Sequence, residues 1–471
     1  MLVEKYKITQ KSKGLQADLL TPVSIFLKLR DRFNNCILLE SSEYNSKENS
    51  RTFICFDPIA GFSVSKNEFK INVLDELTKV EKLQKGQHQL SDLVAQFNLQ
   101  FQVEQCESNM LMGLFGYATF DAVQYMEDIE FVENSEEEEI PLLDYRLYRF
   151  ILMIDHFKNE MFLIENVLNN QISTVSFEQI EAYINHDHTP TFQFQTTEKE
   201  VESISNEEFL NRLEKARSHC FLGDVFQIVV SRSFSQSFKG DDFNVYRALR
   251  TLNPSPYLFY FDYGSFRLFG SSPEAQLTIQ QNKASIYPIA GTFRRTGNAQ
   301  TDKDLALELK SDKKENAEHI MLVDLARNDL NKHCENVRVE QFSEVQYYSH
   351  VIHLVSKVSG ELSKEIQAFD LMAATFPAGT LSGAPKYKAL QLINQIEKNK
   401  RGFYGGAIGY IGFDHSMNQA IMIRSALSKN GKLRYAAGAG VVTLSHLDSE
   451  LQEVNNKLAA MRAAIKNAHQ L

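Results

Sequence analysis

The chain contains no tryptophan among its 471 residues, and its five cysteines form no C-x-x-C pair. The cysteines are scattered along the chain and odd in number. Disulfide frameworks and cysteine-rich zinc sites both need cysteines at recurring, paired spacings. The sequence therefore argues against both classes and predicts a protein of a reducing compartment.

Long apolar runs and an excess of positive charge are also missing. No run approaches the ~20 apolar residues of a membrane-spanning helix. The opening MLVEKYKITQKSKGLQ lacks the apolar core of a signal peptide. Asp and Glu outnumber Lys and Arg by 60 to 50, which gives a formal net charge of −10. We therefore expect a cytoplasmic protein that binds neither nucleic acid nor anionic membranes through charge alone.

The remaining composition, 43% hydrophobic and 23% charged, is that of a globular protein. Strand-like stretches lie near 36–42, 51–64 and 148–156. The acidic run at 133–139 is expected to be a solvated loop, and 185–200 a linker.

From residue 203 onward, glycine-marked strands alternate with amphipathic helices. Asn206 is expected to cap a helix that ends near Gly223. Several strands follow one another at 257–291, which favours antiparallel sheet over alternating βαβ units. We predict an α+β protein whose segments are 1–160 (N-terminal region), 161–202 (connection) and 203–465 (C-terminal domain).

Two predicted helices each carry a pair of glutamates. In 311–330, Glu315 and Glu318 share a face, and in 445–465 Glu450 and Glu453 do the same. Oxygen ligands on two helices suit Mg²⁺, which keeps several waters for an anionic substrate. The alternative is two solvated faces, with Glu315 in a capping box that begins at Asp312.

Glycine-rich turns offer backbone N–H groups to a ligand. PAGTLSGAPK, at 377–386, suits a carboxylate or phosphate, although its spacing is not that of a P-loop. The glycines at 401–413 and 434–442 allow either a close ligand or close strand packing.

Two titratable residues stand at ambiguous positions. Glu274 follows a proline at a strand end, where it is either a buried general acid with a raised pKa or an exposed turn residue. His353 alternates with apolar residues in SHVIHLVSKV, as a hydrogen-bonded core histidine would.

Taken together, these stretches closely resemble the chorismate-utilising enzymes. The resemblance covers about 203–460, and LLES at 38–41 resembles the N-terminal region of anthranilate synthase component I. The family fold is α+β, with two large packed antiparallel sheets and helices outside. The matching motifs are FQIVVSR, GSSPE, PIAGT, AEHIMLVDLARNDL, HLVSKVSGEL, PAGTLSGAPK, YGGAIGYI, IRSAL, GAGVV and the final Glu-x-x-Glu.

The resemblance assigns a role to each carboxylate. It implies that Glu318 and Glu453 bind Mg²⁺ directly and that Glu315 and Glu450 reach it through water. The metal would hold the ring carboxylate of chorismate. Glu274 would protonate the departing 4-hydroxyl, a form of acid catalysis typically worth ~10²–10⁴ in rate.

The resemblance also implies the other contacts. His353 would serve a later elimination of pyruvate. The implied catalytic residues are then Glu274, His353 and Thr380. The roles of Arg294 and Arg295 stay open. The implied substrate-binding residues are Gly291, Thr292, Tyr410, Arg424, Gly438, Ala439, Gly440 and Lys457.

Two positions separate the branches of this family. Relatives that add water carry a lysine base where this chain has Gln227, and aminodeoxychorismate synthases carry a nucleophilic lysine where it has Ala290. The nucleophile is therefore expected to be ammonia. Ammonia would give 2-amino-2-deoxyisochorismate, and loss of pyruvate would then give anthranilate, the first committed step of tryptophan biosynthesis.

Ammonia must have a source, and no cysteine stands in the G-x-C-x-G elbow of a glutaminase. We therefore expect a separate glutamine amidotransferase subunit and a hetero-oligomer. The family's tryptophan feedback site would be formed by residues of two segments: Glu40, Ser41, Arg51, Asn253, Pro254, Ser255, Pro256, Tyr257 and Leu258.

Two alternatives remain. An aminodeoxychorismate synthase component I, of the folate pathway, would give a para-substituted product, and Ala290 argues against it. A non-catalytic regulator that binds tryptophan or chorismate is the second alternative. It would not need the intact set that this chain carries, which is Glu274, Glu318, Glu453, His353 and Arg424.

Overall fold

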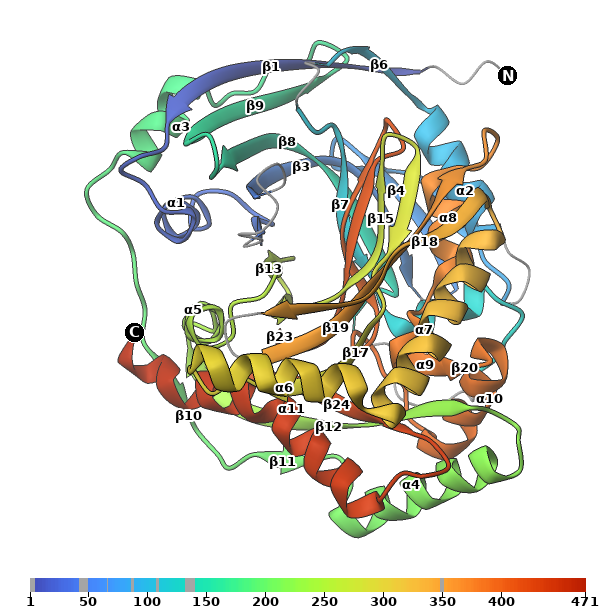
Figure 1. Ribbon diagram of the computed structural model, residues 1–471. Helices are drawn as coiled ribbons and strands as arrows, with labels where there is room; N and C mark the ends of the chain where they lie inside the picture. The colour runs from blue at the N-terminus through green and yellow to red at the C-terminus, as the bar shows by residue number, and fades with distance from the viewer. Residues whose placement is uncertain are drawn as a thin grey trace.

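The computed structural model describes residues 5–41, 50–65, 67–85, 89–106, 110–131, 140–347 and 351–471. Figure 1 shows β1, β9 and β8 together at one end of the molecule, and β12 and β24 beside α11 at the other. Between these two ends, strands from the first third of the chain pair with strands from the last two thirds, as β2 does with β13 and β7 with β21.

Two long strands, β3 (Arg51–Ser65) and β8 (Leu143–Asp155), belong to both sheets. Residues 51–56 pair with 150–155, and 58–64 pair with 143–148, with a register shift between Pro58 and Ala60. Asp57 has a φ of 61° at this point. A bulge bends a strand and increases its twist, so each strand leaves one sheet and enters the other.

The first sheet has the order β6-β1-β9-β8-β3-β2-β13-β14-β23-β24-β12. Only the β1–β6 pair among these is parallel. The strands added here are β1 (Tyr6–Gln16), β2 (Ile37–Glu40), β6 (Phe101–Gln105), β9 (Glu160–Leu168), β12 (Gln227–Gly240), β13 (Tyr257–Asp262), β14 (Arg267–Ser272), β23 (Ser425–Lys429) and β24 (Lys432–Val441).

The second sheet has the order β5-β4-β3-β8-β7-β21-β22-β15-β16-β19, and β17 and β18 also pair with β19. All of these pairs are antiparallel. The strands added are β4 (Glu68–Val73), β5 (Glu76–Lys82), β7 (Gly113–Ala118), β15 (Ala275–Gln280), β16 (Lys283–Ile286), β17 (Ile289–Arg294), β18 (Cys334–Tyr347), β19 (Val351–Leu362), β21 (Ala407–Gly412) and β22 (Met417–Ile421).

Helices cover the outer faces of the sheets. α5 and α11 pack on the first sheet, and α7 and α8 pack on the second. The fold prediction of two packed antiparallel sheets with helices outside is confirmed. The helices are α1 (Pro22–Leu29), α2 (Gln89–Leu99), α3 (Phe177–Ile184), α4 (Asn206–Phe221), α5 (Phe243–Leu252), α6 (Ala299–Ser311), α7 (Lys313–Asn331), α8 (Ala368–Thr375), α9 (Gly379–Ser382), α10 (Lys386–Glu397) and α11 (Leu447–Asn467).

A buried apolar cluster between the sheets joins strands of the N-terminal third to strands of the rest of the chain. It joins side chains of β2, β3 and β7 to those of β13, β14 and β22, with Tyr117, Phe115 and Phe259 fully buried. Burial of aromatic side chains of this size removes a large apolar area from water. The N-terminal third is therefore part of the same core as the rest of the chain.

Several local predictions are confirmed and two are wrong. The helices predicted at 311–330 and 445–465 are α7 and α11, and Asp312 Oδ1 accepts the Glu315 N–H at 3.0 Å. Asn206 is not the cap of α4, because the Ser205 hydroxyl accepts the Glu208 N–H at 3.2 Å. The predicted linker contains β10 (Phe194–Thr196), which pairs with the end of β12.

Two further predictions stay predictions. The acidic run at 133–139 lies outside the described residues. The segment boundaries 1–160, 161–202 and 203–465 stay a prediction, since β2 pairs with β13 and β7 with β21, so that both sheets mix strands of the first and last segments.

Candidate active site

The predicted site residues meet between β12 and β24 of the first sheet, β17 and β19 of the second, and helices α7 and α11. Gly440 on β24 shows how tightly these parts fit. A Cβ atom there would lie 2.6 Å from Nε2 of Gln227, the first residue of β12. A larger residue at this position would displace the Gln227 amide from its present place beside β24.

The Gln227 amide holds one of the predicted metal ligands. Its Nε2 donates to Glu318 Oε1 at 2.8 Å, from β12 to α7. Gln227 is 4% exposed, and its Oε1 makes no hydrogen bond within the described part of the chain. A primary amide cannot take a proton from water, so this side chain orients its neighbours and does not act as a base.

Helix α11 approaches the same strand from the other side. Lys457 Nζ donates to the Gly438 carbonyl at 2.9 Å and lies 2.6 Å from Glu453 Oε1. The Lys457 and Glu453 side chains are 41% and 45% exposed, so this ion pair is open to solvent and contributes little stability. The pair instead places a cation and a carboxylate beside β24.

The other two predicted ligands also lie nearby. The Glu315 carboxylate is close to Gly291, where an added Cβ would lie 3.1 Å from Glu315 Oε2. Glu450 is 5% exposed on the inner side of α11. Over the described ranges, however, no three His, Cys, Asp or Glu side chains are grouped closely enough to hold a metal ion. The magnesium site therefore stays a prediction.

Glu274 lies in the short turn between β14 and β15, where its side chain is half-buried. Burial raises the pKa of this carboxyl to about 7, although the Thr380 hydroxyl, Lys457 and Arg424 all favour its ionised form. Thr380 Oγ1 donates to Glu274 Oε1 at 3.0 Å. A carboxyl with this pKa is substantially protonated at neutral pH and suits general acid catalysis.

His353 is 4% exposed on β19, as the alternation of its segment predicts. Its Nδ1 lies 2.9 Å from the Gly291 carbonyl. Since a carbonyl only accepts, the proton is assigned to Nδ1, and Nε2 is the basic nitrogen. Burial lowers the pKa of His353 to about 4, which keeps the ring neutral at physiological pH.

The Gly291 carbonyl can reach His353 because β17 is bulged there. The register with β19 shifts between Ala290 and Thr292, and Gly291 has a φ of 67°. This left-handed conformation favours glycine. Ala290 is 7% exposed, and the Thr292 side chain is not among those described.

Arg424 has a φ of 49° between β22 and β23, a conformation that non-glycine residues rarely adopt. Such outliers concentrate at functional sites. Its Nη1 donates to Asn253 Oδ1 at 3.3 Å, and burial lowers the pKa of its guanidinium. Tyr410 packs against Phe53 and Phe115, and burial raises the pKa of its hydroxyl to about 12.

The predicted tryptophan-site residues come together because β2 lies between β3 and β13. Glu40 is opposite Thr52 on one side and Leu258 on the other. The Glu40 carboxylate, 6% exposed, accepts two hydrogen bonds from Arg250 at 2.9 Å each. The turn from Asn253 to Leu258 connects α5 to β13.

Two other members of this set join β2 to the start of β3. Ser41 N donates to the Arg51 carbonyl at 3.2 Å, and Arg51 Nε lies 3.7 Å from Asp155 Oδ2. Pro254, Ser255, Pro256 and Tyr257 all belong to the connecting turn and the first residue of β13. The role of these residues in feedback regulation by tryptophan stays a prediction.

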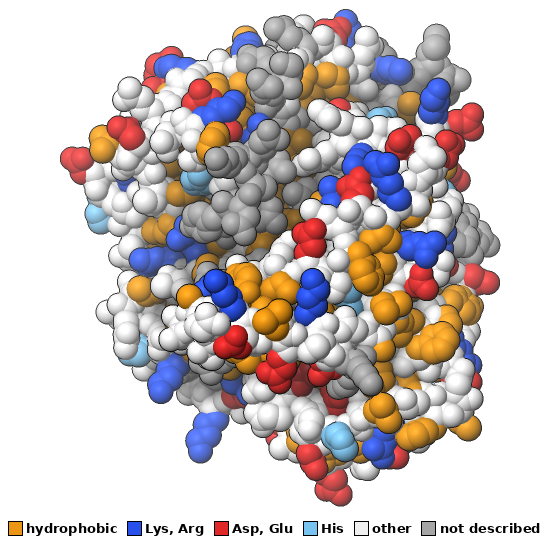
Figure 2. All heavy atoms as spheres, in the orientation of Figure 1, with side chains coloured by type: hydrophobic (Ala, Val, Ile, Leu, Met, Phe, Trp, Pro, Cys, Tyr) orange, Lys and Arg blue, Asp and Glu red, His pale blue; other side chains and the backbone are white. Residues whose placement is uncertain are grey.

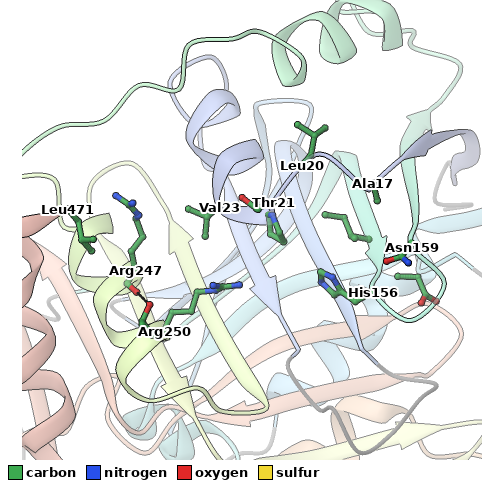
Figure 3. Close-up of a pocket in the computed structure, with 13 residues that line it drawn as sticks. Ala17, Leu20, Thr21, Val23, His156, Asn159, Arg247, Arg250 and Leu471 are labelled. Atoms are coloured by element: carbon green, nitrogen blue, oxygen red, sulfur yellow. Dashed lines mark hydrogen bonds between the residues drawn. The ribbon is translucent and has the colours of Figure 1, made fainter.

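A cavity of about 500 Å³ adjoins this cluster (Figure 3). Arg250 of α5 and His156 at the end of β8 point into it from opposite sides. Asp155, which pairs with Arg51, and Thr21, which caps α1, also line it. Because Arg250 binds Glu40, one wall of the cavity is shared with the predicted regulatory cluster.

Some residues near the site were not predicted from the sequence. Gln276 lines the same small cavity as Glu274, but it lies where the register of β15 with β22 shifts between Ala275 and Leu277, so no regular strand period marks it in the sequence. Asp329 and Lys386 form a buried ion pair at 2.7 Å behind it. Arg295 pairs with Asp302 at 2.9 Å, which supports a structural role for this arginine. The side chain of Arg294 is not described.

Acidic, basic and hydrophobic side chains are interspersed over the face in Figure 2. In the described part of the chain, every helix is too short or too polar to cross a membrane.

Comparison with known proteins places this geometry in a class. A family model described as chorismate binding enzyme matches residues 34–463. The chain therefore belongs to the chorismate-binding enzymes.

Within that family, the full-length relatives share one name. The chain is 35% identical to anthranilate synthase component 1 of Aquifex aeolicus, across 100% of this chain and 97% of that protein. It is 32% identical to the protein of the same name from Bacillus subtilis, across 96% and 91%.

Solved structures agree with these relatives. Anthranilate synthase component I of Streptococcus pneumoniae superposes with a TM-score of 0.75 at 29% identity, covering 95% of this chain and 98% of that one. The menaquinone-specific isochorismate synthase of Escherichia coli has the same TM-score at 18% identity, covering 98% and 95%. At that identity the second structure shows the shared fold alone.

Proposed function

We propose that the chain is the synthase component that converts chorismate and ammonia to anthranilate and pyruvate. The observation that supports this most directly is the Gln227 amide, which binds Glu318 where water-adding relatives carry a base. Ala290 supports it as well, because a buried alanine provides no internal nucleophile and leaves space at the same wall.

The first step would be the addition of ammonia at C2 of chorismate. The nitrogen lone pair forms the C2–N bond, the ring double bonds shift, and the C4–O bond breaks with its electrons on oxygen. Glu274, partly protonated at neutral pH, would give its proton to this oxygen, which leaves as water. Thr380 keeps the carboxyl oriented through its 3.0 Å hydrogen bond.

The second step would be the elimination of pyruvate from 2-amino-2-deoxyisochorismate. A base takes the C2 proton, the C2–H electrons form the last ring double bond, and the C3–O bond breaks. The ring becomes aromatic, and the released enolpyruvate takes up a proton at carbon to become pyruvate. His353 Nε2 would act here as the base or orienting group, with its Nδ1–H held by Gly291. Arg424 and Tyr410 would bind the enolpyruvyl carboxylate, and an arginine fork suits a planar anion. Gly291, Thr292, Gly438, Ala439 and Gly440 would line the ring and its carboxylate.

The proposed magnesium site is supported by the chemistry of the glutamates on α7 and α11, because carboxylate oxygens are the ligands that Mg²⁺ prefers. Glu318 and Glu453 would bind it directly, and Glu315 and Glu450 through water. When bound, the ion would neutralise the ring carboxylate of chorismate. Glu453 contacts Lys457, so its carboxylate would exchange the ammonium for the metal ion.

Ammonia would come from a separate glutamine amidotransferase subunit. The name component 1 of the relatives supports a partner component, and the lack of a G-x-C-x-G elbow in this chain supports glutaminase chemistry on that partner. Tryptophan would inhibit at the cluster of Glu40, Ser41, Arg51 and the turn from Asn253 to Leu258. The Asn253–Arg424 hydrogen bond supports this regulation, because it joins the cluster to the proposed substrate site.

The test is a product assay on the purified chain with chorismate and Mg²⁺, supplied with either ammonium or glutamine. The proposal predicts anthranilate with ammonium and none with glutamine alone. An aminodeoxychorismate product would place the chain in the folate branch, and isochorismate would show that water is the nucleophile.

A further inference from the structure

A small cavity lies behind Glu274, between β15, α7 and the turn that contains Thr380. Its volume is about 30 Å³, which leaves room for about two water molecules. Glu274, Gln276, Asp329 and Thr380 line it together with apolar residues of α7. On α7, Asp329 stands eleven residues after Glu318, about 16 Å along the helix axis, so the cavity extends away from the proposed metal ligands.

The cavity has a polar atom that points to an occupant. Gln276 is 3% exposed, and its Nε2 donates to Thr375 Oγ1 at 3.0 Å. Its Oε1 is buried and makes no hydrogen bond within the described ranges. An unsatisfied buried acceptor destabilises the folded protein, and a water in the cavity would satisfy it.

Asp329, on the far wall of the cavity, forms a buried ion pair with Lys386. Lys386 Nζ lies 2.7 Å from Asp329 Oδ2, and also donates to the Thr375 carbonyl. Each side chain of the pair is 8% exposed, so both touch solvent at their edges. Lys332 and Glu127 lie beyond the pair, 3.3 Å apart on the surface.

We propose that Gln276 and Asp329, which line the cavity, and Lys386, which pairs with Asp329, form a water-filled proton path that returns a proton to Glu274 after each turnover. The proposal rests on the role of Glu274 as the acid. When the 4-hydroxyl leaves as water, Glu274 becomes a carboxylate, and the C2 nitrogen keeps one extra proton until solvent removes it. One proton must therefore reach Glu274 from solvent.

The path avoids the substrate face of Glu274. On that face its carboxyl is close to Thr380, Lys457 and Arg424, and bound chorismate would close the approach. Burial raises the pKa of Asp329 and lowers that of Lys386, while Lys386, Lys332 and Glu127 also act on Asp329. Both groups are therefore easier to neutralise than exposed side chains, which favours proton exchange between them.

The test uses the full chain with ammonium, Mg²⁺ and saturating chorismate at pH 8.5, where the return of the proton is slowest. Gln276→Leu removes the amide from the cavity wall, and Ile286→Val changes the same wall without removing a polar atom. Asp329→Asn combined with Lys386→Met removes both charges, so no buried charge is left unpaired. Thermal unfolding checks that each variant is folded.

We expect Gln276→Leu and the double variant to lower kcat about tenfold, with the KM for chorismate changed less than about twofold. The solvent deuterium isotope effect on kcat should rise, and imidazole should restore the rate by supplying protons. Ile286→Val should match the parent chain in all three measurements. A structural role alone would not produce rescue by imidazole.

A normal kcat in both altered chains would overturn the proposal, as would a lower kcat that responds neither to deuterium oxide nor to imidazole. The variant Glu274→Gln distinguishes a failure of the proton path from a failure of the proposed role of Glu274 as the acid. If Glu274→Gln retains full activity, the assignment of the acid is wrong; if it is inactive while Gln276→Leu is normal, only the proton path is wrong.

Discussion

The side-chain amide of Gln227 donates to the Glu318 carboxylate at 2.8 Å, and Gly440 leaves space for this contact. One residue thereby positions a proposed metal ligand and removes a base from the nucleophile's side of the site. We propose that this side chain, which itself takes no proton, decides between ammonia and water as the nucleophile.

Replacement of Gln227 by lysine should change the nucleophile. A lysine placed beside Glu318 would form an ion pair and bring an amine that can deprotonate water. We expect ammonia-dependent anthranilate formation to fall by at least about tenfold and isochorismate to appear, both measured by chromatography. Gln227→Met, which has similar volume and no donor, should lose anthranilate without gaining isochorismate. Isochorismate from the methionine variant would contradict this explanation.

The pKa of Glu274 leads to a prediction about pH. Its folded-state pKa of about 7 exceeds the ordinary value of 4.5, so the folded protein loses stability as the pH rises between these values. Glu274→Gln does not titrate and should gain stability relative to the parent chain over this range, by up to about 3 kcal/mol. Urea unfolding at pH 4.5 and 7.5 measures the difference, and an equal difference at both pH values would refute it.

Activity should follow the same group. At a constant concentration of free ammonia, kcat/KM should fall as the pH rises through about 7. Thr380→Val removes the hydrogen bond that favours the ionised form of the Glu274 carboxyl. In this variant the fall of kcat/KM with rising pH should therefore occur at a higher pH. Thr380→Ser, which keeps the hydroxyl, is the matched control and should follow the parent profile.

His353→Ala should separate the two chemical steps. If His353 serves only the elimination, chorismate will still be consumed with ammonium, and 2-amino-2-deoxyisochorismate will accumulate. The rate of anthranilate formation should fall by at least about 100-fold. Mass spectrometry of the product mixture identifies the intermediate. Complete loss of chorismate consumption would show that His353 is needed in the first step as well.

The Asn253–Arg424 hydrogen bond should link inhibition to substrate binding. Asn253→Ala removes the acceptor of Arg424, so the KM for chorismate should rise about tenfold, and tryptophan should inhibit more weakly. Thr251→Ala, an exposed change on the preceding helix, is the control. If Asn253→Ala changes neither the KM for chorismate nor the inhibition by tryptophan, the Asn253–Arg424 contact does not couple the two sites.

Glu318→Ala should raise the Mg²⁺ concentration for half-maximal activity more than about tenfold. Glu308→Ala on α6, an exposed glutamate outside the site, should leave it unchanged. Titration of Mg²⁺ into chelator-treated protein gives both values. Equal requirements in the two variants would show that Glu318 does not bind the ion.

Sequence periodicity and family motifs predicted the two sheets and helices α7 and α11 because these elements have strong local patterns. They did not predict which carboxylate pairs with which donor. The Glu40–Arg250 and Asp329–Lys386 pairs join residues 210 and 57 positions apart, and only the three-dimensional fold brings them together.

The cap of α4 and the strand β10 were missed for local reasons. Ser205 and Asn206 are both good capping residues, and the sequence alone does not decide between neighbours. β10 is short and polar, and it forms only because the end of β12 offers it a partner. Burial of Glu274 was likewise left open by the sequence, since a Pro-Glu turn is ordinarily exposed.

The most direct test of the central claim is to incubate the purified chain with chorismate, Mg²⁺ and ¹⁵N-ammonium and to analyse the product by mass spectrometry. We predict anthranilate that contains one ¹⁵N atom, together with an equal amount of pyruvate. A para-substituted aminated product, or a hydroxylated product without ¹⁵N, would contradict the proposed reaction.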